Sequence, residues 1–292
     1  MMRGMYSAIS GLEASQTMLD VTANNLANSD TIGFKGQSTS FVDELSQTLS
    51  APTGPNGFNG GSAAKQVGLG VEVGSIDNEM GTGSLQNTGN ALDIAIQGAG
   101  FFQVGNGAPG TTSPYTSNLP SSVQYTRAGN LTLNAAGFLT TQSGQYVVGA
   151  TAPSNNSSST PTYINVPPGS TNVAVGQDGS VTYTDENASS PTFGQTVNAG
   201  YISLATFPND AGLERDGGSL WSATAASGAP TTGTPSVAGF GQTLSGNLEM
   251  SNVDMATEFT NMITAERTYQ ANSKVITTAD SMLQTLVNMP QG

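Results

Sequence analysis

The chain has 292 residues and a formal net charge of −13, with seven lysines and arginines and neither cysteine nor histidine. These two absences exclude disulfides, a zinc site built on cysteine or histidine, and a Ser–His–Asp triad. So few basic residues also argue against nucleic acid or an anionic membrane as a partner.

The composition favours contact with other proteins instead. Charged residues make up 9% of the chain, where about 25% is usual for a soluble domain. The surface must therefore be built mainly from Ser, Thr, Asn, Gln and Gly. No run of about 18 apolar residues occurs, as a membrane span would need, so we expect no insertion into a membrane. The amino-terminal stretch also lacks the apolar segment of an ordinary signal peptide, so we expect export by another route.

The first predicted element is an amino-terminal helix over residues 1–30. Its apolar residues recur at alternating steps of three and four, with one break at Gln16, and this heptad pattern is typical of a helix that packs along one seam. The other faces carry small uncharged residues rather than the Glu and Lys of a solvated helix. We therefore expect other helices around it, with copies of the same chain among them. The seam consists of Met2, Met5, Ile9, Leu12, Leu19, Ala23 and Leu26.

The end of this helix, "ANNLANSDTIGFK", is unusually rich in asparagine. Asparagine side chains compete for the hydrogen bonds of a helix backbone, so their presence needs another reason. Asn24, Asn25 and Asn28 lie beside the seam, where we expect their amides to bond to helix ends and loops of adjacent subunits. Gly33 is predicted to supply an unusual backbone angle, and Phe34 to enter the following domain and to be part of the assembly interface.

Between the two ends of the chain the apolar pattern changes to a period of two with frequent turn signals. Residues 31–85 are predicted to be a connecting segment with extended or hairpin structure. Residues 86–245 are predicted to form an antiparallel β domain of short strands, in which "NVAVGQDGSVTYT" reads as a hairpin around Asp178-Gly179.

The last predicted element is a helix within residues 246–292. A seam recurs every seven residues from Met255, and Asp254 offers a helix start. Two long helices with apolar seams are most economically buried against each other. We therefore expect an α+β fold, in which the terminal helices pair as a coiled-coil-like inner domain and the β domain is inserted between them. The residues of this helix predicted to form interfaces are Phe259, Met262, Tyr269, Ile276 and Leu283.

Two other classes of function were weighed against an assembly protein. A β-rich adhesin or carbohydrate-binding protein would explain the polar loops but leaves the two seams unexplained. An enzyme with paired carboxylates could use Asp210 and Glu214, but we interpret these groups, like Asp185, as solvated loop charges. We expect no enzymatic activity, cofactor or metal.

Motifs along nearly the whole chain resemble those of bacterial flagellar axial proteins, the rod and hook subunits. The resemblance begins with "MYSAISGLEASQTMLDVTANNLANSDTIGFKGQSTSFVDELSQTL" and continues through "GSLQNTGNALDIAIQGAGFFQV" and "YTRAGNLTLNAAGFLTTQSGQYVVG". It ends with "SGNLEMSNVDMATEFTNMITAERTYQANSKVITTADSMLQTLVNM". Its order agrees with the helix, β insert and helix expected from the residues.

The resemblance implies a structural subunit that leaves the cell through the flagellar type III export apparatus and polymerises helically around a central channel. The motifs look more like those of short hook subunits, so the expected function is a flexible joint that transmits motor torque to the filament. The alternative is a distal rod subunit of the basal body. The partners implied are further copies of the chain, the distal rod, the hook cap and the hook–filament junction, at an extracellular location in the hook or basal body.

Overall fold

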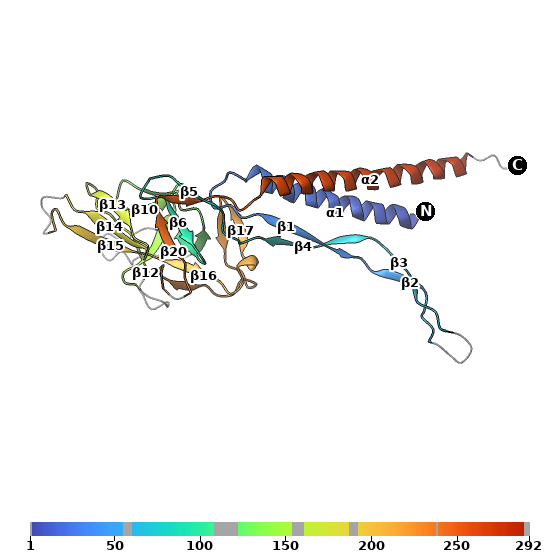
Figure 1. The fold of residues 1–292 in the computed structure, drawn as a ribbon, viewed down its shortest axis with the longest axis horizontal. Coiled ribbons are helices and arrows are strands. Elements are labelled where there is room, and N and C mark those ends of the chain that lie inside the picture. Colours follow the sequence, from blue (N-terminus) through green and yellow to red (C-terminus); the bar gives the residue numbers. More distant parts are fainter. Residues whose placement is uncertain are drawn as a thin grey trace. The chain divides into compact units, whose positions relative to one another are not determined.

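The computed structural model describes residues 2–54, 60–107, 122–153, 161–186, 192–237 and 239–288. The chain forms two compact units, each assembled from segments far apart in the sequence (Figure 1). The helical unit comprises Met1–Ala27, Gln37–Asn78 and Val253–Gly292. The β unit comprises Asn28–Gly36 and Glu79–Asn252. The predicted α+β class is confirmed, whereas the domain boundaries and the coiled-coil-like pairing stay predictions.

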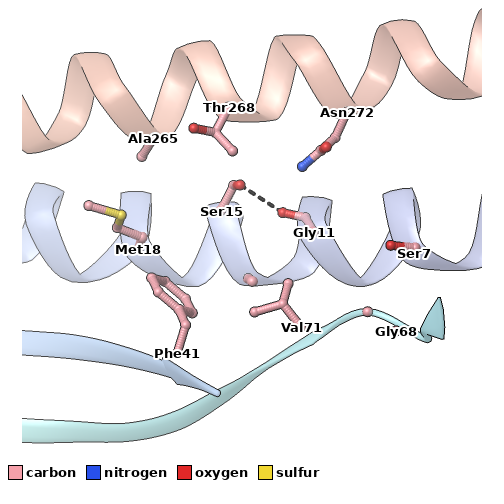
Figure 2. A pocket seen from close by; sticks show the side chains of 12 residues that line it. Ser7, Gly11, Ser15, Met18, Phe41, Gly68, Val71, Ala265, Thr268 and Asn272 are labelled. Carbon is pink, nitrogen blue, oxygen red and sulfur yellow. Dashed lines mark hydrogen bonds between the residues drawn. The ribbon is translucent and has the colours of Figure 1, made fainter. Parts of the chain in front are cut away.

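The helical unit contains two long helices, α1 (Met2–Ala27) and α2 (Met255–Val287), which lie side by side in Figure 2. Helix α2 begins at Asp254, as the sequence predicts. The Asp254 carboxylate accepts hydrogen bonds from Ala256 N at 3.0 Å and from the Thr257 hydroxyl at 3.0 Å. The bond from Thr257, followed by that from Ala256, lowers the pKa of Asp254. The cap thus satisfies a backbone N–H that the helix cannot pair within itself.

A two-stranded ribbon completes this unit. β1 (Gln37–Asp43) pairs antiparallel with β4 (Val71–Asn78), with a bulge between Ser40 and Phe41. The ribbon continues as β2 (Ser46–Ser50) paired with β3 (Lys65–Gly68), and every residue of these two strands is exposed. A two-stranded hairpin exposed on both faces is marginally stable in water.

The β unit holds the remaining strands, and all strand pairs recorded for the described residues are antiparallel. Thirteen of the described strands form one sheet whose main path is β13-β14-β15-β11-β7-β8-β18-β17. Outside this sheet, β20 pairs with β6 and β21 with β5. The strands are β5 (Leu85–Asn87), β6 (Ile94–Gln97), β7 (Phe101–Gly105), β8 (Val123–Thr126), β9 (Leu131–Leu133), β10 (Leu139–Thr141), β11 (Tyr146–Ala150), β12 (Pro161–Tyr163), β13 (Thr171–Val175), β14 (Ser180–Thr184), β15 (Thr196–Ile202), β16 (Leu204–Thr206), β17 (Glu214–Gly217), β18 (Leu220–Ser222), β19 (Thr231–Gly233), β20 (Gln242–Ser245) and β21 (Asn247–Glu249), with a short 3-10 helix at Asp210–Gly212.

The predicted hairpin around Asp178-Gly179 is present and joins β13 to β14. Gly179 has a φ of +76°, a backbone angle that glycine adopts without steric cost. The Asp178 carboxylate accepts from Ser180 N at 3.2 Å and from the Ser180 hydroxyl at 2.6 Å. The hydroxyl bond is the main reason that the pKa of Asp178 is lowered.

The β unit is built around two apolar clusters. The larger one joins strands of the main sheet to β6 through fully buried residues such as Ile94, Phe102 and Ile202. The smaller one surrounds Trp221, the only tryptophan of the chain, whose side chain is 2% exposed. Burial of these side chains gives this unit a core of its own.

Candidate assembly surface

The face of α1 that is buried in the helical unit differs from the predicted seam. The buried residues are small or polar: Ala8, Gly11, Ala14, Ser15, Thr22 and Asn25. Except for Ala14, they follow one another at steps of three, four or seven.

Close approach of the two helices explains this choice of face. A Cβ atom added at Gly11 would lie 2.6 Å from Asn272 Nδ2 of α2, so a larger residue there would require the Asn272 side chain to shift. The hydroxyls of the buried face are satisfied within α1, since Ser15 donates to Gly11 O at 2.7 Å and Thr22 to Met18 O at 2.9 Å. They therefore cost little when they leave water.

The predicted seam of α1 lies beside this contact. Ile9 is 41% exposed, while Met5, Leu12, Leu19 and Leu26 are half-buried. On α2, Met262, Ile276 and Leu283 are half-buried, whereas Phe259 and Tyr269 are 49% and 40% exposed. The fully buried residue of α2 is Ala265, again a small one. Small residues therefore fill the closest contacts of α1 and α2, and the mutual burial of the two large apolar seams stays a prediction.

A cavity of about 530 Å³ opens between α1, α2 and the ribbon (Figure 2). In this view α1 runs between α2 and the strands, and Phe41 and Val71 point toward α1. The other residues lining the cavity are small or uncharged: Ser7, Gly11, Ala14, Ser15, Met18, Gly68, Gly70, Ala265, Thr268 and Asn272.

The three predicted asparagines have different environments. Asn25 is 1% exposed and joins three elements of the helical unit. Its amide donates to Gln37 O at 2.7 Å and to the Glu258 carboxylate at 3.1 Å, and accepts from Gln37 N at 2.9 Å. Asn24 is exposed, and Asn28 accepts from the Thr31 hydroxyl at 3.2 Å. Asn25 is therefore used inside its own subunit, and a role in subunit contacts stays a prediction for the other two.

The angle at Gly33 and the entry of Phe34 into the β unit agree with the prediction, whereas the burial of Phe34 leaves little of it for the predicted assembly interface. Gly33 has a φ of +67°, and a Cβ atom there would lie 2.6 Å from Ala128 N. Phe34 is buried in the β unit, and the guanidinium of Arg215 lies 4.6 Å from the centre of its ring. Arg215 also lies 4.8 Å from the Trp221 ring, which gives a cation held between two aromatic faces.

Exposed apolar side chains gather in the helical unit. Among the described residues, Leu85 and Phe193 are the only exposed large apolar side chains of the β unit. The helical unit exposes many more, with Leu45 at 82%, Val287 at 83% and Tyr6 at 65%. Large apolar surfaces of this kind mark contacts with other proteins. The candidate functional site of this chain is therefore an assembly surface formed by α1, α2 and the ribbon.

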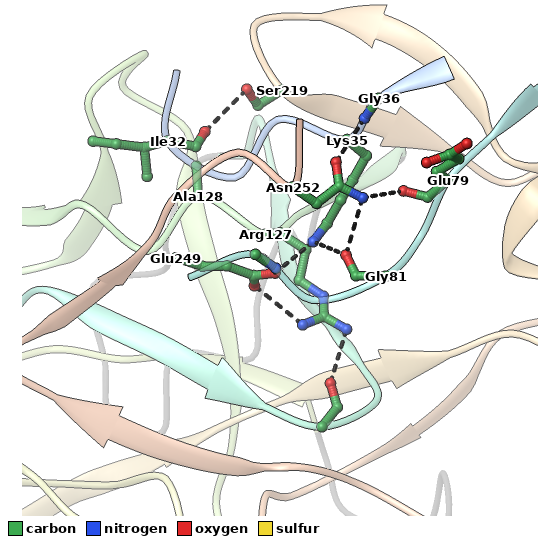
Figure 3. A network of polar contacts seen from close by, with 12 residues as sticks. Ile32, Lys35, Gly36, Glu79, Gly81, Arg127, Ala128, Ser219, Glu249 and Asn252 are labelled. Carbon is green, nitrogen blue, oxygen red and sulfur yellow. Dashed lines mark hydrogen bonds and ion pairs between the residues drawn. The ribbon is translucent and has the colours of Figure 1, made fainter. Parts of the chain in front are cut away.

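A buried group of charges, which sequence reasoning missed, lies in the β unit (Figure 3). The Glu249 carboxylate forms ion pairs with Lys35 and, at 3.2 Å, with Arg127, and it also accepts from Gly83 N at 3.0 Å. The side chains of Lys35 and Glu249 are 0% exposed and that of Arg127 is 4% exposed. Burial lowers the pKa of Lys35, which the charge of Glu249 partly opposes.

The residues around Glu249 account for a large share of the chain's few basic residues. With Arg215, which donates to Lys35 O, this charge group uses three of the seven basic residues of the chain. Lys35 and Glu249 are 214 positions apart, so no local pattern could pair them. The one signal in the sequence that could have indicated this group was the rarity of basic residues. Buried cations almost always have a charged partner.

The carboxylates considered for catalysis lie in different environments. Glu214 is exposed on β17, and Asp210 is half-buried in the 3-10 helix, where burial raises its pKa. The interpretation of Asp185 as a solvated charge is wrong: it is 5% exposed and accepts from the Thr192 hydroxyl at 2.7 Å. In the parts of the chain that the structure describes, no cluster of acidic residues is suited to a metal ion, and no helix has the length and apolarity to cross a membrane.

Three family models match the chain. The amino-terminal one, described as flagella basal body rod protein, covers residues 5–35. The D1 domain of flagellar hook protein FlgE/F/G matches residues 95–183. The C-terminal model of flagellar basal body rod FlgEFG protein matches residues 244–289. These matches cover most of α1, a large part of the β unit and all of α2.

Curated relatives agree along the full length. The flagellar basal-body rod protein FlgG of Bacillus subtilis is 40% identical, with 99% of both chains covered. FlgG of Agrobacterium fabrum is 38% identical over 96% of this chain and 97% of its own. The flagellar hook protein FlgE of Salmonella typhimurium is 28% identical over 97% of this chain and 98% of its own. The chain belongs to the family of bacterial flagellar axial proteins, the structural subunits of the rod and hook.

Proposed function

We propose that this chain is a distal rod subunit of the flagellar basal body. The observation that supports this most directly is the way in which it aligns with its relatives. Its alignment with the Bacillus rod protein spans 290 positions, whereas the alignment with the Salmonella hook protein spans 414. A chain of 292 residues therefore matches the rod protein with few gaps but faces long unmatched stretches in the hook protein. This favours the alternative named in the sequence analysis over the hook function expected there.

The assembly surface supports a polymer as the working form. Apolar side chains of α1, α2 and the ribbon are exposed in the single chain, and burying them between copies would remove them from water. We infer that copies stack by a heterologous contact that does not close on itself, which produces a helical polymer. The contact residues proposed for it are Met5, Ile9, Leu12, Leu19, Asn24, Leu26, Asn28, Phe259, Met262, Tyr269, Ile276 and Leu283.

Two further points belong to this proposal. The polymer encloses a central channel, and its subunits reach it through the flagellar type III export apparatus. The neighbouring axial proteins at each end of the polymer are then its hetero-oligomeric partners. A drive shaft of this kind must carry torque without bending, in contrast to the flexible joint expected for a hook.

Electron microscopy of isolated basal bodies tests the proposal. A tagged copy that replaces the native chain should be labelled along the distal rod, inside the outer cell envelope. A tagged hook subunit of the same cells is the matched control, with label outside the envelope. Label confined to the hook would contradict the rod assignment and restore the hook function.

A further inference from the structure

The chain passes between its two units at four positions: after Ala27, Gly36, Asn78 and Asn252. Any load carried along the covalent chain from one unit to the other must pass through these crossings. Four residues of the β unit stand directly at them, namely Asn28, Gly36, Glu79 and Asn252. How the last three are held affects how load enters the β unit at three of the four crossings.

The three residues form a closed ring of hydrogen bonds. Glu79 N donates to Gly36 O at 2.9 Å, and Gly36 N donates to Asn252 Oδ1 at 2.8 Å. Asn252 Nδ2 closes the ring by donating to Glu79 O at 2.7 Å (Figure 3). An amide side chain carries a donor and an acceptor together, so one asparagine holds both neighbouring crossings. Serine, aspartate or alanine at this position cannot make the same two bonds.

The buried charge group ties the same segments together a second time. Lys35 Nζ, one residue before Gly36, donates to Gly81 O at 2.8 Å and pairs with Glu249. Glu249 in turn accepts from Gly83 N at 3.0 Å through its carboxylate and from Gly33 N at 2.8 Å through its backbone carbonyl. Each of the three crossing segments is thus bonded to both of the others.

We propose that Asn252 is a positioning residue that clamps three chain crossings into one block, so that load enters the β unit through all three together. Bonds that are loaded together resist separation, whereas a single strand can be peeled away one bond at a time. The clamp itself is a property of the monomer. Its load-bearing role rests on the proposed function as a rod subunit.

Hydrogen exchange on the full-length monomer tests the clamp. Asn252→Ala should raise exchange at the amides of Gly36 and Glu79 by about tenfold or more, since each loses a bond or its support. Amides of the central strands β7 and β11 should keep their wild-type rates. Asn252→Asp keeps the acceptor for Gly36 N and should raise exchange mainly at Glu79. Asn165→Ala is the matched control, because Asn165 donates a single bond to Ala136 O at 3.0 Å and takes no part in the ring.

Two outcomes would overturn the clamp. Exchange at Gly36 and Glu79 could be unchanged in Asn252→Ala, or it could rise equally in β7 and β11, which would indicate general destabilisation of the β unit.

The load-bearing role is tested in cells whose swimming is followed as medium viscosity is raised with a polymer. Cells carrying Asn252→Ala should build basal bodies of normal number and rod length, yet lose motility at a lower viscosity than cells with wild type or Asn165→Ala. Swimming that equals the wild type at every viscosity, with the exchange effect present, would overturn this role. If a tagged wild-type chain were missing from the rod, the proposed function would be overturned, and the load-bearing role with it. The clamp would still be decided by the exchange measurement.

Discussion

Removing the charge of Glu249 is the sharpest available test of the reasoning about the β unit. Glu249→Gln preserves shape and one acceptor oxygen but deprives two buried cations, Lys35 and Arg127, of their counter-charge. Lys35→Met removes one cation and leaves Glu249 paired with Arg127 and Gly83 N. The double variant Lys35→Met/Glu249→Gln leaves a single uncompensated cation.

The magnitudes follow from complete burial of the pair, with both side chains 0% exposed. Breaking a buried ion pair by removing one partner costs about 3–5 kcal/mol, because the other charge stays buried and unpaired. We expect this loss for Glu249→Gln. Lys35→Met should cost about 1–3 kcal/mol, since the acceptor keeps two other donors. The double variant should be more stable than Glu249→Gln alone, because the unpaired ammonium is gone.

Trp221 makes the measurement specific to the β unit. It is the only tryptophan and is 2% exposed beneath the Arg215 guanidinium, so its fluorescence should change when this unit unfolds. Urea titrations of the four proteins give the free energy of unfolding of the unit from this one signal. Additive losses in the double variant, or a smaller loss for Glu249→Gln than for Lys35→Met, would refute the reasoning.

Three further predictions concern other parts of the chain. Asn25→Ala leaves the backbone N–H and C=O at the start of β1 without their partner, so the helical unit should lose about 1–3 kcal/mol, measured by circular dichroism in urea. Gly129→Ala would place a Cβ atom 1.6 Å from Ile94 O. It should cost more than about 3 kcal/mol in the tryptophan-monitored transition. Gly54→Ala, with nothing within 4 Å, should be neutral in the transition of its own helical unit, followed by circular dichroism. The pKa of Asp178 is lower in the folded protein than its ordinary value of 3.8, so its ionised carboxylate stabilises the fold at pH values above 3.8. This stabilisation is lost as the pH falls through the pKa of the folded state. Asp178→Asn should therefore flatten the fall of the urea midpoint below about pH 4.

The parts of the fold that depend on neighbouring residues could be predicted from the sequence. The helix start at Asp254, the turn at Gly179 and the angle at Gly33 each depend on a side chain and the backbone within a few residues of it. The change from heptad spacing to a period of two likewise separates the two helices from the strands. Such signals are local, so a single sequence contains them.

The packed face of α1 could not be predicted in the same way. Periodicity finds where large apolar residues align, and Ile9 and Leu12 satisfy that rule. The contact with α2 instead selects Gly11 and Ser15, because the distance between helices depends on a partner far away in sequence. The pairing of Lys35 with Glu249 and the burial of Asp185 fail for the same reason, since both are set by tertiary neighbours.

The unexpected face of α1 strengthens the argument for assembly. If the large apolar residues of both helices were buried against each other within one chain, little apolar surface would remain for contacts between copies. The structure instead packs the helices through small residues and leaves Ile9, Phe259 and Tyr269 at least 40% exposed. A single chain thus folds with close helix contact while keeping apolar side chains for other chains. Enlarging the small residues should therefore harm the subunit itself, whereas polar substitution of the exposed ones should harm polymerisation alone.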